Sequence, residues 1–214
     1  HLPNCKVVSR YGVGVDSVDL KAATDLGIIV ANVPDYCVDE VSNQTIAMIL
    51  TLIRKTAFFD QKVKSNRWDF HQGIPIYRIH GKTLGLIGCG RIGLEVAKKI
   101  SPFGVKVIAF DPYLQRAGEG VELTDFDTVL KKSDFISIHC PLTPETRHLF
   151  DRTALLKMKK GAILVNTARG PIVDEAALVE ALEQGRLGGA GLDVYDPQPP
   201  AEDNPLLRLE QVVL

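Results

Sequence analysis

Three regularly spaced glycines and the apolar stretch before them carry the most specific chemistry in this chain. Gly88, Gly90 and Gly93 have the spacing GxGxxG and follow the apolar sequence TLGLI. The first glycine permits a sharp turn out of a strand, the second lets a diphosphate approach the backbone, and the third lets the next helix pack closely. That helix would begin near Arg91, with its free N–H groups facing the diphosphate. An ordinary glycine turn is the alternative interpretation, but the flanking elements favour a nucleotide site.

An acidic residue follows at the distance that a dinucleotide site requires. Asp111 closes the apolar run VKVIAF, eighteen residues after Gly93. A carboxylate in this place can accept hydrogen bonds from both ribose hydroxyls and repels a 2′-phosphate. The sequence therefore predicts NAD, and not NADP, as the cofactor.

Polar residues at the ends of later strands are the candidates for substrate chemistry. Arg169 follows an apolar strand and precedes Gly170 and a proline, so its guanidinium should project from a tight turn into the crevice. There it can bind a carboxylate bidentately and polarise a carbonyl; capping of turn carbonyls is the alternative. Asp193 could accept a hydrogen bond from a carboxamide or serve as a turn aspartate. We expect His139 to be a packed residue and not a base.

Composition excludes several other classes of protein. The 214 residues carry a net charge of −1 and no basic patch with interleaved aromatics, which gives no support for a nucleic-acid partner. The longest apolar run is too short to span a bilayer, and no leader is visible. The cysteines are scattered, without metal-ligand spacing, so we expect no metal and a reducing cytoplasmic location. We expect Cys89, between the first two glycines, to face the phosphates; the others are Cys5, Cys37 and Cys140.

Apolar periodicity divides the chain into two parts. From residue 83 onward strands and helices alternate, which predicts a doubly wound parallel sheet covered on both faces. The strands are expected at 83–88, 105–110, 135–140, 162–168 and 188–195, and the helices at 91–103, 124–131, 152–158 and 174–184. Before this part we expect a β-α-β unit, two helices and a loop, with bounds 5–10, 17–26, 28–32, 38–55, 57–65 and 68–80. The predicted boundary separates residues 1–39 from residues 40–214, and both ends suggest an internal piece of a longer protein.

The motifs together resemble the D-isomer-specific 2-hydroxyacid dehydrogenases. Those that carry the resemblance are RYGVGVDSVDL, NVPDYCVDE, GKTLGLIGCGRIG, FDPY, HCPLTPETRHLF, NTARGPIVDEAALVEALEQGRL and GLDVYDP. The chain is most similar to the branch of phosphoglycerate dehydrogenases and C-terminal-binding-protein corepressors. The resemblance implies an α/β fold in which a Rossmann-type NAD-binding domain, residues 40–214, is joined to a remnant of a flavodoxin-like substrate domain, residues 1–39. It also implies a homodimer through the long helix before the glycine motif.

The resemblance assigns roles to individual residues. Arg169 would bind the substrate carboxylate and orient its carbonyl, and backbone N–H groups of Val13 and Gly14 would bind the same carboxylate. The cofactor residues would be Gly88, Gly90 and Gly93, Arg91 and Ile92 at the diphosphate, Asp111 at the ribose, Cys140, Pro141 and Thr146 on the adenine side, Ala168 near Arg169, and Asp193 at the nicotinamide amide.

The chain departs from the family's pattern in two ways that affect catalysis. The family's general acid is a histidine just after the strand that corresponds to QVVL, beyond Leu214, so we expect residues 1–214 by themselves to be inactive. The family's glutamate partner of that histidine corresponds to Gln198, twenty-nine residues after Arg169. A glutamine can hold the ring but does not raise its pKa, so we expect the complete enzyme to work best at lower pH. Formate dehydrogenases also carry this glutamine, but the asparagine that they use has no counterpart in residues 34–39.

The sequence thus predicts NAD-dependent interconversion of a small D-2-hydroxy acid and its 2-keto acid. Lactate, glycerate, phosphoglycerate and bulkier acids all remain open as substrates. The alternative is a non-catalytic, NAD(H)-sensing dimeric scaffold of the corepressor type, which the absent histidine and Gln198 permit. A hydrolase of the adenosylhomocysteine type is disfavoured because Arg169 suits a carboxylic acid.

Overall fold

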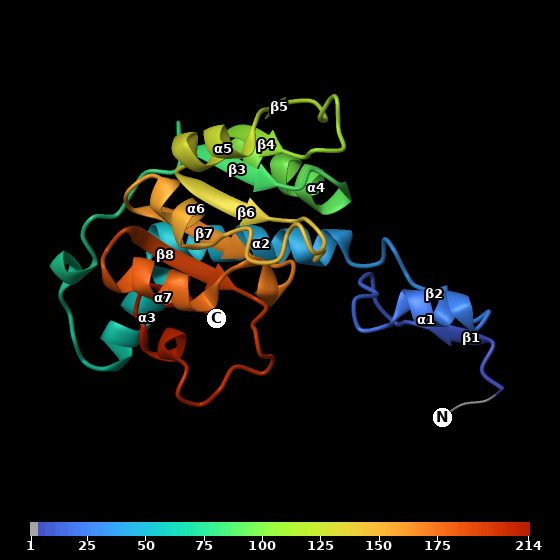
Figure 1. The fold of residues 1–214 in the computed structure, drawn as a ribbon. Helices are drawn as coiled ribbons and strands as arrows, with labels where there is room; N and C mark the ends of the chain where they lie inside the picture. Colours follow the sequence, from blue (N-terminus) through green and yellow to red (C-terminus); the bar gives the residue numbers. More distant parts are fainter. Residues whose placement is uncertain (1–3) are drawn as a thin grey trace.

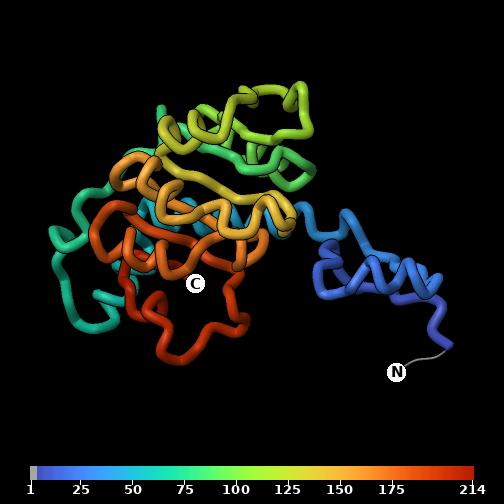
Figure 2. Tube along the Cα trace, in the orientation of Figure 1, coloured from blue at the N-terminus to red at the C-terminus, as the bar shows by residue number. Residues whose placement is uncertain are grey.

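The computed structural model describes residues 4–214 and contains two parallel sheets of different size (Figure 1). The smaller sheet pairs β1 (Val7–Ser9) with β2 (Ile29–Ala31), and α1 (Leu20–Asp25) connects them. The larger sheet has seven strands in the order β5-β4-β3-β6-β7-β8-β9. In Figure 1 the smaller unit stands beside the larger body, and Figure 2 shows the trace passing between them once.

The larger unit alternates strands and helices along the chain. Its strands are β3 (Thr83–Ile87), β4 (Lys106–Phe110), β5 (Val121–Leu123), β6 (Phe135–Ile138), β7 (Ala162–Asn166), β8 (Leu187–Leu192) and β9 (Val212–Val213). Its helices are α2 (Val38–Arg54), α3 (Thr56–Lys64), α4 (Arg91–Ile100), α5 (Phe126–Lys132), α6 (Arg152–Lys157) and α7 (Glu175–Glu183). Short 3₁₀ helices cover Phe70–Gly73, Ser101–Phe103, Gly170–Ile172 and Pro205–Arg208. No helix of the described residues is long and apolar enough to cross a membrane.

The strand order confirms the predicted doubly wound sheet. The chain runs outward from β3 through β4 to β5, then returns to the centre at β6 and continues outward the other way. The reversal lies between β3 and β6, which pair in parallel. In such sheets ligands bind where the strand order reverses, beyond the carboxyl ends of the strands.

Two apolar clusters cover the two faces of this sheet. One contains buried residues of α2 and α4 with one side of the strands, and the other contains those of α5, α6 and α7. All residues of β6 and β7 are buried, as expected for parallel strands covered on both faces. The central strands are therefore rigidly placed, and so are the residues that follow their ends.

The long helix α2 connects the two units and is fixed to the larger one through a lysine. Lys99 of α4 donates hydrogen bonds to the Asp39 carboxylate at 2.6 Å, the Ser42 hydroxyl at 2.7 Å and the Asn43 amide oxygen at 2.7 Å. These acceptors lie in the first turns of α2, where acidic residues also favour the helix dipole. The start of α2, and with it the end of the smaller unit, is held against α4.

The structure corrects several predicted bounds. The expected helix 91–103 is α-helical only to Ile100, because Pro102 and Gly104, with φ of 70°, turn the last residues into a 3₁₀ helix. The helix expected from residue 17 starts at Leu20, since the Asp19 side chain accepts from the N–H of Ala22. Strand β5 was not predicted, because three residues at a sheet edge carry too little periodicity. The expected loop 68–80 contains a 3₁₀ turn at Phe70–Gly73.

We predict that Gly85→Ala destabilises the fold. A Cβ at Gly85 would lie 2.3 Å from the Ser133 hydroxyl and 2.5 Å from a Val129 methyl, so α5 must move away from β3. Overpacking of this kind costs about 1–3 kcal/mol, which urea denaturation measures. Gly90→Ala is the matched control, because a Cβ there meets nothing within 4 Å. Equal unfolding free energies for the two variants would contradict the prediction.

Candidate functional site

The glycine turn after β3 brings three pieces of backbone into close approach. Gly88 has φ of 89°, and a Cβ on it would lie 2.7 Å from the backbone nitrogen of Cys140. A Cβ on Gly93 would lie 2.5 Å from the carbonyl oxygen of Gly88. Gly90 is the N-cap of α4 and faces open space. The turn therefore has the compact base and the open outer side that a diphosphate requires.

Asp111, just after β4, is held beside the glycine turn by hydrogen bonds. One carboxylate oxygen accepts from the backbone N–H of Cys89 at 2.9 Å, and the other accepts from the N–H of Tyr113 at 3.0 Å. These two bonds orient the carboxylate beside the glycine turn. A ribose bound there would meet the lone pairs that the two N–H groups do not occupy.

The expectation that Cys89 faces the phosphates is wrong. Its side chain is 1% exposed and packs in the cluster of α2, α4 and the sheet. Burial, with a smaller contribution from the charge of Asp111, raises the pKa of its thiol. The turn presents the Cys89 N–H to Asp111 and directs the side chain inward, which the glycine spacing alone does not reveal.

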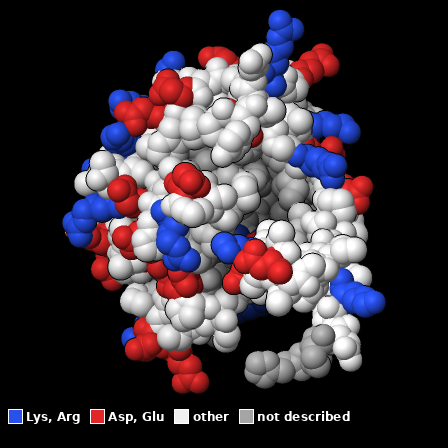
Figure 3. Space-filling view, turned by 45° about the vertical axis from the view of Figure 1, so that its right-hand side comes forward, with Lys and Arg blue, Asp and Glu red and all other residues white. Residues whose placement is uncertain are grey.

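Two cavities meet at the carboxyl end of β6. One, of about 340 Å³, lies over the ends of β3 and β4; the other, of about 540 Å³, lies between the larger unit and residues 13–20. His139, Cys140 and Pro141 line both. Among the sequence-predicted residues, Gly88, Gly90, Asp111 and Thr146 line the first, and Val13, Gly14, Ile92, Ala168 and Arg169 line the second. Figure 3 shows a hollow with a largely uncharged wall and charged side chains of both signs around it.

The segment after β6 is shaped by its own hydrogen bonds. The Thr146 hydroxyl donates to the carbonyl of Pro141 at 2.7 Å and accepts from the N–H of Thr143 at 2.8 Å. Burial raises the pKa of Cys140 to about 11, so its thiol is protonated at neutral pH. Burial lowers the pKa of His139 to about 4, and its ring contacts the Ser137 hydroxyl at 2.9 Å. His139 is thus a neutral, packed residue, as the sequence predicts.

Arg169 is fixed from two sides. Its Nε lies 3.1 and 3.0 Å from the two carboxylate oxygens of Asp16, and its Nη1 donates to the carbonyl of Ala168 at 2.6 Å. The buried side chain of Asn166 shapes the turn beneath it, accepting from the N–H of Ala168 and donating to the carbonyl of Arg169. Among residues 4–214 no acceptor is found for Nη2 or for the second N–H of Nη1, so these groups can serve a ligand. The predicted alternative, carbonyl capping, therefore occupies only part of the guanidinium.

The turn of the smaller unit that contains Val13 and Gly14 lies against Arg169. A Cβ on Gly14 would fall 1.6 Å from Nη2 of Arg169, so a larger residue there would displace the guanidinium. The carbonyls of Val13 and Gly14 accept from the side chains of Asn32 at 2.8 Å and Arg10 at 3.0 Å. Because these two carbonyls are already hydrogen-bonded, the backbone N–H groups of Val13 and Gly14 are the polar groups left to face a ligand.

Asp193, at the end of β8, meets a residue that sequence reasoning missed. Its carboxylate lies 3.3 Å from the side-chain amide nitrogen of Gln44 on α2. The neighbouring Thr45 hydroxyl lies 3.0 Å from that of Thr167, so α2 contacts the ends of both β7 and β8. The two residues of each pair are more than a hundred positions apart, and no motif marks them.

Gln198 is not brought into either cavity. Its side chain is exposed and it is absent from the lining of both. Within residues 4–214 no group of three or more His, Cys, Asp or Glu side chains is arranged to hold a metal ion.

Comparison with known proteins identifies the chain's relatives. Residues 46–214 match the family model of the D-isomer specific 2-hydroxyacid dehydrogenase, NAD binding domain. The chain is 46% identical to a D-3-phosphoglycerate dehydrogenase of Archaeoglobus fulgidus, with 98% of the chain and 40% of that protein covered. It is 43% identical to a glyoxylate reductase of Thermofilum pendens, with 99% and 65% covered. The chain thus spans about two fifths of the first relative and under two thirds of the second.

Solved structures agree with this family. An NAD-dependent formate dehydrogenase from Staphylococcus aureus in complex with NAD superposes with a TM-score of 0.93 at 39% identity, covering 99% of this chain and 64% of that one. A D-lactate dehydrogenase from Aquifex aeolicus, complexed with NAD and lactic acid, gives 0.88 at 35% identity, covering 97% and 68%. These relatives are all named as oxidoreductases, and the alternative of a non-catalytic scaffold has no support among them.

We predict that the Asp16–Arg169 pair stabilises the contact between the two units in a pH-dependent way. The hydrogen bond from Arg169 lowers the pKa of Asp16, so this stabilisation is complete above the unfolded pKa, about 3.9. It disappears as the pH falls through the lower folded pKa. Urea denaturation should therefore show a constant difference between the wild type and Asp16→Asn from pH 7 to about pH 5, and a shrinking one below about pH 4.

Asp35→Asn is the matched control, because Asp35 is an exposed aspartate that also lies before α2. A difference for Asp16→Asn that is no larger than for this control, or that persists unchanged at low pH, would contradict the prediction.

Proposed function

We propose a function from one premise: the chain belongs to the D-isomer specific 2-hydroxyacid dehydrogenase family. Residues 46–214 match its NAD binding domain, and the cofactor is NAD. We assign to the complete protein the NAD-dependent interconversion of a D-2-hydroxy acid and its 2-keto acid. The position of Arg169 carries the proposal, because it puts a partly free guanidinium in the cavity adjoining the glycine turn.

The residues at the first cavity fit NAD. The open side of Gly90 and the first N–H groups of α4, at Arg91 and Ile92, would hold the diphosphate, and Asp111 would hold the adenine ribose. Cys140, Pro141 and Thr146 would lie on the adenine side, and Ala168 and Asp193 near the nicotinamide. NAD supplies the site that exchanges hydride with the substrate carbon.

The residues at the second cavity fit a small 2-keto acid. The free N–H groups of Arg169 would bind its carboxylate and polarise its carbonyl oxygen, and the N–H groups of Val13 and Gly14 would hold the carboxylate from the other side. Without cofactor the Gln44 amide occupies the Asp193 carboxylate, and a bound nicotinamide amide would compete with Gln44 for it. We assign the role of proton donor in the complete protein to a histidine, as the resemblance implies.

This arrangement gives the two units different roles. We propose that residues 1–39 belong to a substrate domain and residues 40–214 to the NAD-binding domain; residues 1–3 lie outside the described part. The separate sheet of β1 and β2 supports the boundary, as does the start of α2 at Val38.

We further propose a homodimer through the surface next to α2 and α3. Large apolar side chains are exposed after α3, with Trp68 at 89%, and a second copy would bury them; the others are Phe70 and Ile74. We place the protein in the cytoplasm, because its four cysteines are free thiols.

Replacement of Arg169 tests the activity. In the complete protein, Arg169→Lys should lower kcat/KM for 2-keto acids by about 100-fold or more, because a point charge cannot replace the bidentate fork. The dissociation constant of NADH, measured by fluorescence, should stay within about two-fold, since Arg169 lines the other cavity. Glyoxylate, pyruvate and hydroxypyruvate form the substrate set, with formate as the test for formate oxidation. No turnover of any keto acid by the complete wild type would overturn the proposal.

Replacement of Asp111 tests the choice of cofactor. Asp111→Ala removes two hydrogen bonds to the ribose and the charge that repels a 2′-phosphate, so NADH should bind about ten-fold more weakly. The ratio of NADPH to NADH affinity should rise. Glu145→Ala, which changes another acidic residue lining the same cavity, is the control. An unchanged ratio for Asp111→Ala would show that this carboxylate does not select NAD.

The pH profile of the complete enzyme tests the role of Gln198. If Gln198 contacts the catalytic histidine, Gln198→Glu should raise the histidine's pKa by about 1–3 units. The descending alkaline limb of keto-acid reduction should move upward by the same amount, because the histidine must be protonated to donate. Gln184→Glu is a control on another element. An unmoved limb would remove Gln198 from the site.

A further inference from the structure

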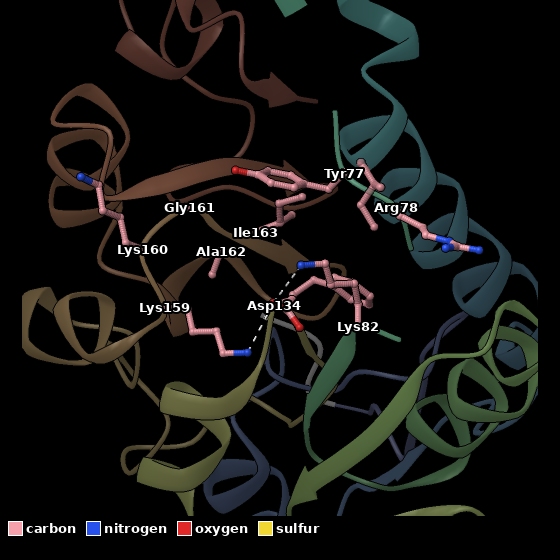
Figure 4. Close-up of a pocket in the computed structure, with 11 residues that line it drawn as sticks. Tyr77, Arg78, Lys82, Asp134, Lys159, Lys160, Gly161, Ala162 and Ile163 are labelled. Atoms are coloured by element: carbon pink, nitrogen blue, oxygen red, sulfur yellow. Dashed lines mark hydrogen bonds and ion pairs between the residues drawn. The ribbon is translucent and has the colours of Figure 1, made fainter. Parts of the chain in front are cut away.

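A third cavity lies at the opposite edge of the large sheet, where β3, β6 and β7 begin (Figure 4). It has a volume of about 130 Å³. Its apolar lining comes from α2 and from the first residues of β6 and β7, and consists of Ile53, Phe135, Ala162 and Ile163. Neither the cofactor nor the substrate cavity shares any of these residues. The proposed dehydrogenase activity gives this cavity no role.

Two lysines from different segments converge at its wall. Lys82 Nζ lies 3.5 Å and Lys159 Nζ lies 3.3 Å from the same carboxylate oxygen of Asp134. The other oxygen accepts from the backbone N–H of Thr83 at 2.9 Å. Figure 4 shows both ammonium groups directed toward Asp134 from opposite sides. Asp134 thus holds two cations together while it neutralises only one of them.

The two ammonium groups keep most of their donors. Each has three N–H bonds, and one directed at Asp134 leaves two. Arg78 and Lys160 also line the cavity; their charged ends point away from its centre in Figure 4. The Lys82 and Lys159 ammonium groups against the single Asp134 carboxylate give this wall an excess of positive charge, which attracts anions.

A tyrosine completes the set of donors. The Lys82 ammonium lies 5.3 Å from the centre of the Tyr77 ring, a cation–π contact that fixes the ring across the cavity. Within residues 4–214 no hydrogen bond is found for the Tyr77 hydroxyl. Figure 4 shows this hydroxyl reaching toward Gly161, at the start of β7. The hydroxyl is free to donate to a bound oxyanion.

We propose that this cavity binds the phosphate group of a small phosphate monoester. Lysine ammonium groups bind phosphate as compact point charges. A phosphate monoester carries about −1.5 to −2 charges at pH 7, so two ammonium groups attract it more strongly than they attract a singly charged carboxylate. Lys82, Lys159 and the Tyr77 hydroxyl hold the phosphate oxygens. The apolar wall, with Ile53 and Phe135, receives a short carbon chain. The volume of about 130 Å³ suits a short carbon chain better than a nucleotide.

Calorimetric titration of the purified protein tests this site without turnover. Saturating NADH occupies the diphosphate site, and the probe is glycerol 3-phosphate, which has no carboxylate for Arg169. Glycerol is the matched probe without phosphate, and ionic strength is held constant with chloride. We expect saturable binding of glycerol 3-phosphate and no heat from glycerol.

Variants locate the binding. Lys82→Gln and Lys159→Gln should each weaken it by about ten-fold, the effect of one lost hydrogen bond to a charged group. Tyr77→Phe, which keeps the ring and all charges, should weaken it by about three-fold. Lys157→Gln is the matched control, because Lys157 pairs with Asp127 outside this cavity. Melting temperatures without ligand identify any variant that fails to fold.

Two outcomes overturn the proposal. The first is binding of glycerol 3-phosphate no tighter than that of glycerol. The second is an equal loss of affinity in Lys157→Gln and Lys82→Gln, which would indicate general attraction to surface lysines. Neither outcome affects the dehydrogenase proposal, since the probe and the variants leave Arg169 and the glycine turn unchanged.

Discussion

The close approach of backbone at Gly88, Gly93 and Cys140 is the constraint on which the site depends. A Cβ at Gly88 would strike the start of the segment after β6, and a Cβ at Gly93 would strike the carbonyl of Gly88. Without side chains at these places, α4 begins directly over the end of β3 and its first N–H groups face the cleft. Both cavities share the segment that begins at His139, so the same contact shapes the cavity that we propose for the cofactor and one wall of the cavity that we propose for the substrate.

The cavity that we propose for the substrate depends on a second interaction, which joins distant parts of the chain. Asn166 fixes the turn after β7 through two hydrogen bonds, and Asp16 of the smaller unit holds the guanidinium of Arg169. Gly14 leaves the space in which that guanidinium lies. The catalytic arginine that we propose is therefore oriented by both units at once. A displacement of the smaller unit would change its direction without changing any residue of the larger one.

The sides of the sheet at the carboxyl ends and at the amino ends of its strands, called here its carboxyl and amino edges, differ in the arrangement of charged groups. At the carboxyl edge the charged groups are few and individually placed, as with Asp111, which two N–H groups orient. At the amino edge basic residues gather around Asp134, which also fixes the start of β3 through the N–H of Thr83. The same buried strands separate these two environments, so a ligand at one edge does not contact a ligand at the other.

The sequence by itself determined the parallel sheet and the glycine turn, and it predicted the strand ends to within about three residues. Hydrophobic periodicity and composition reflect local structure. The spacing of Gly88, Gly90 and Gly93 likewise reflects what the backbone of a single turn requires. It failed where local signals are weak or absent: β5 is a short edge strand, and the inward direction of Cys89 depends on the turn. Only the tertiary structure decided that Asp16 meets Arg169, that Gln44 meets Asp193 and that Lys82 and Lys159 share Asp134. Such pairs arise from the packing of elements far apart in the chain, and no periodicity or spacing along the sequence encodes that geometry.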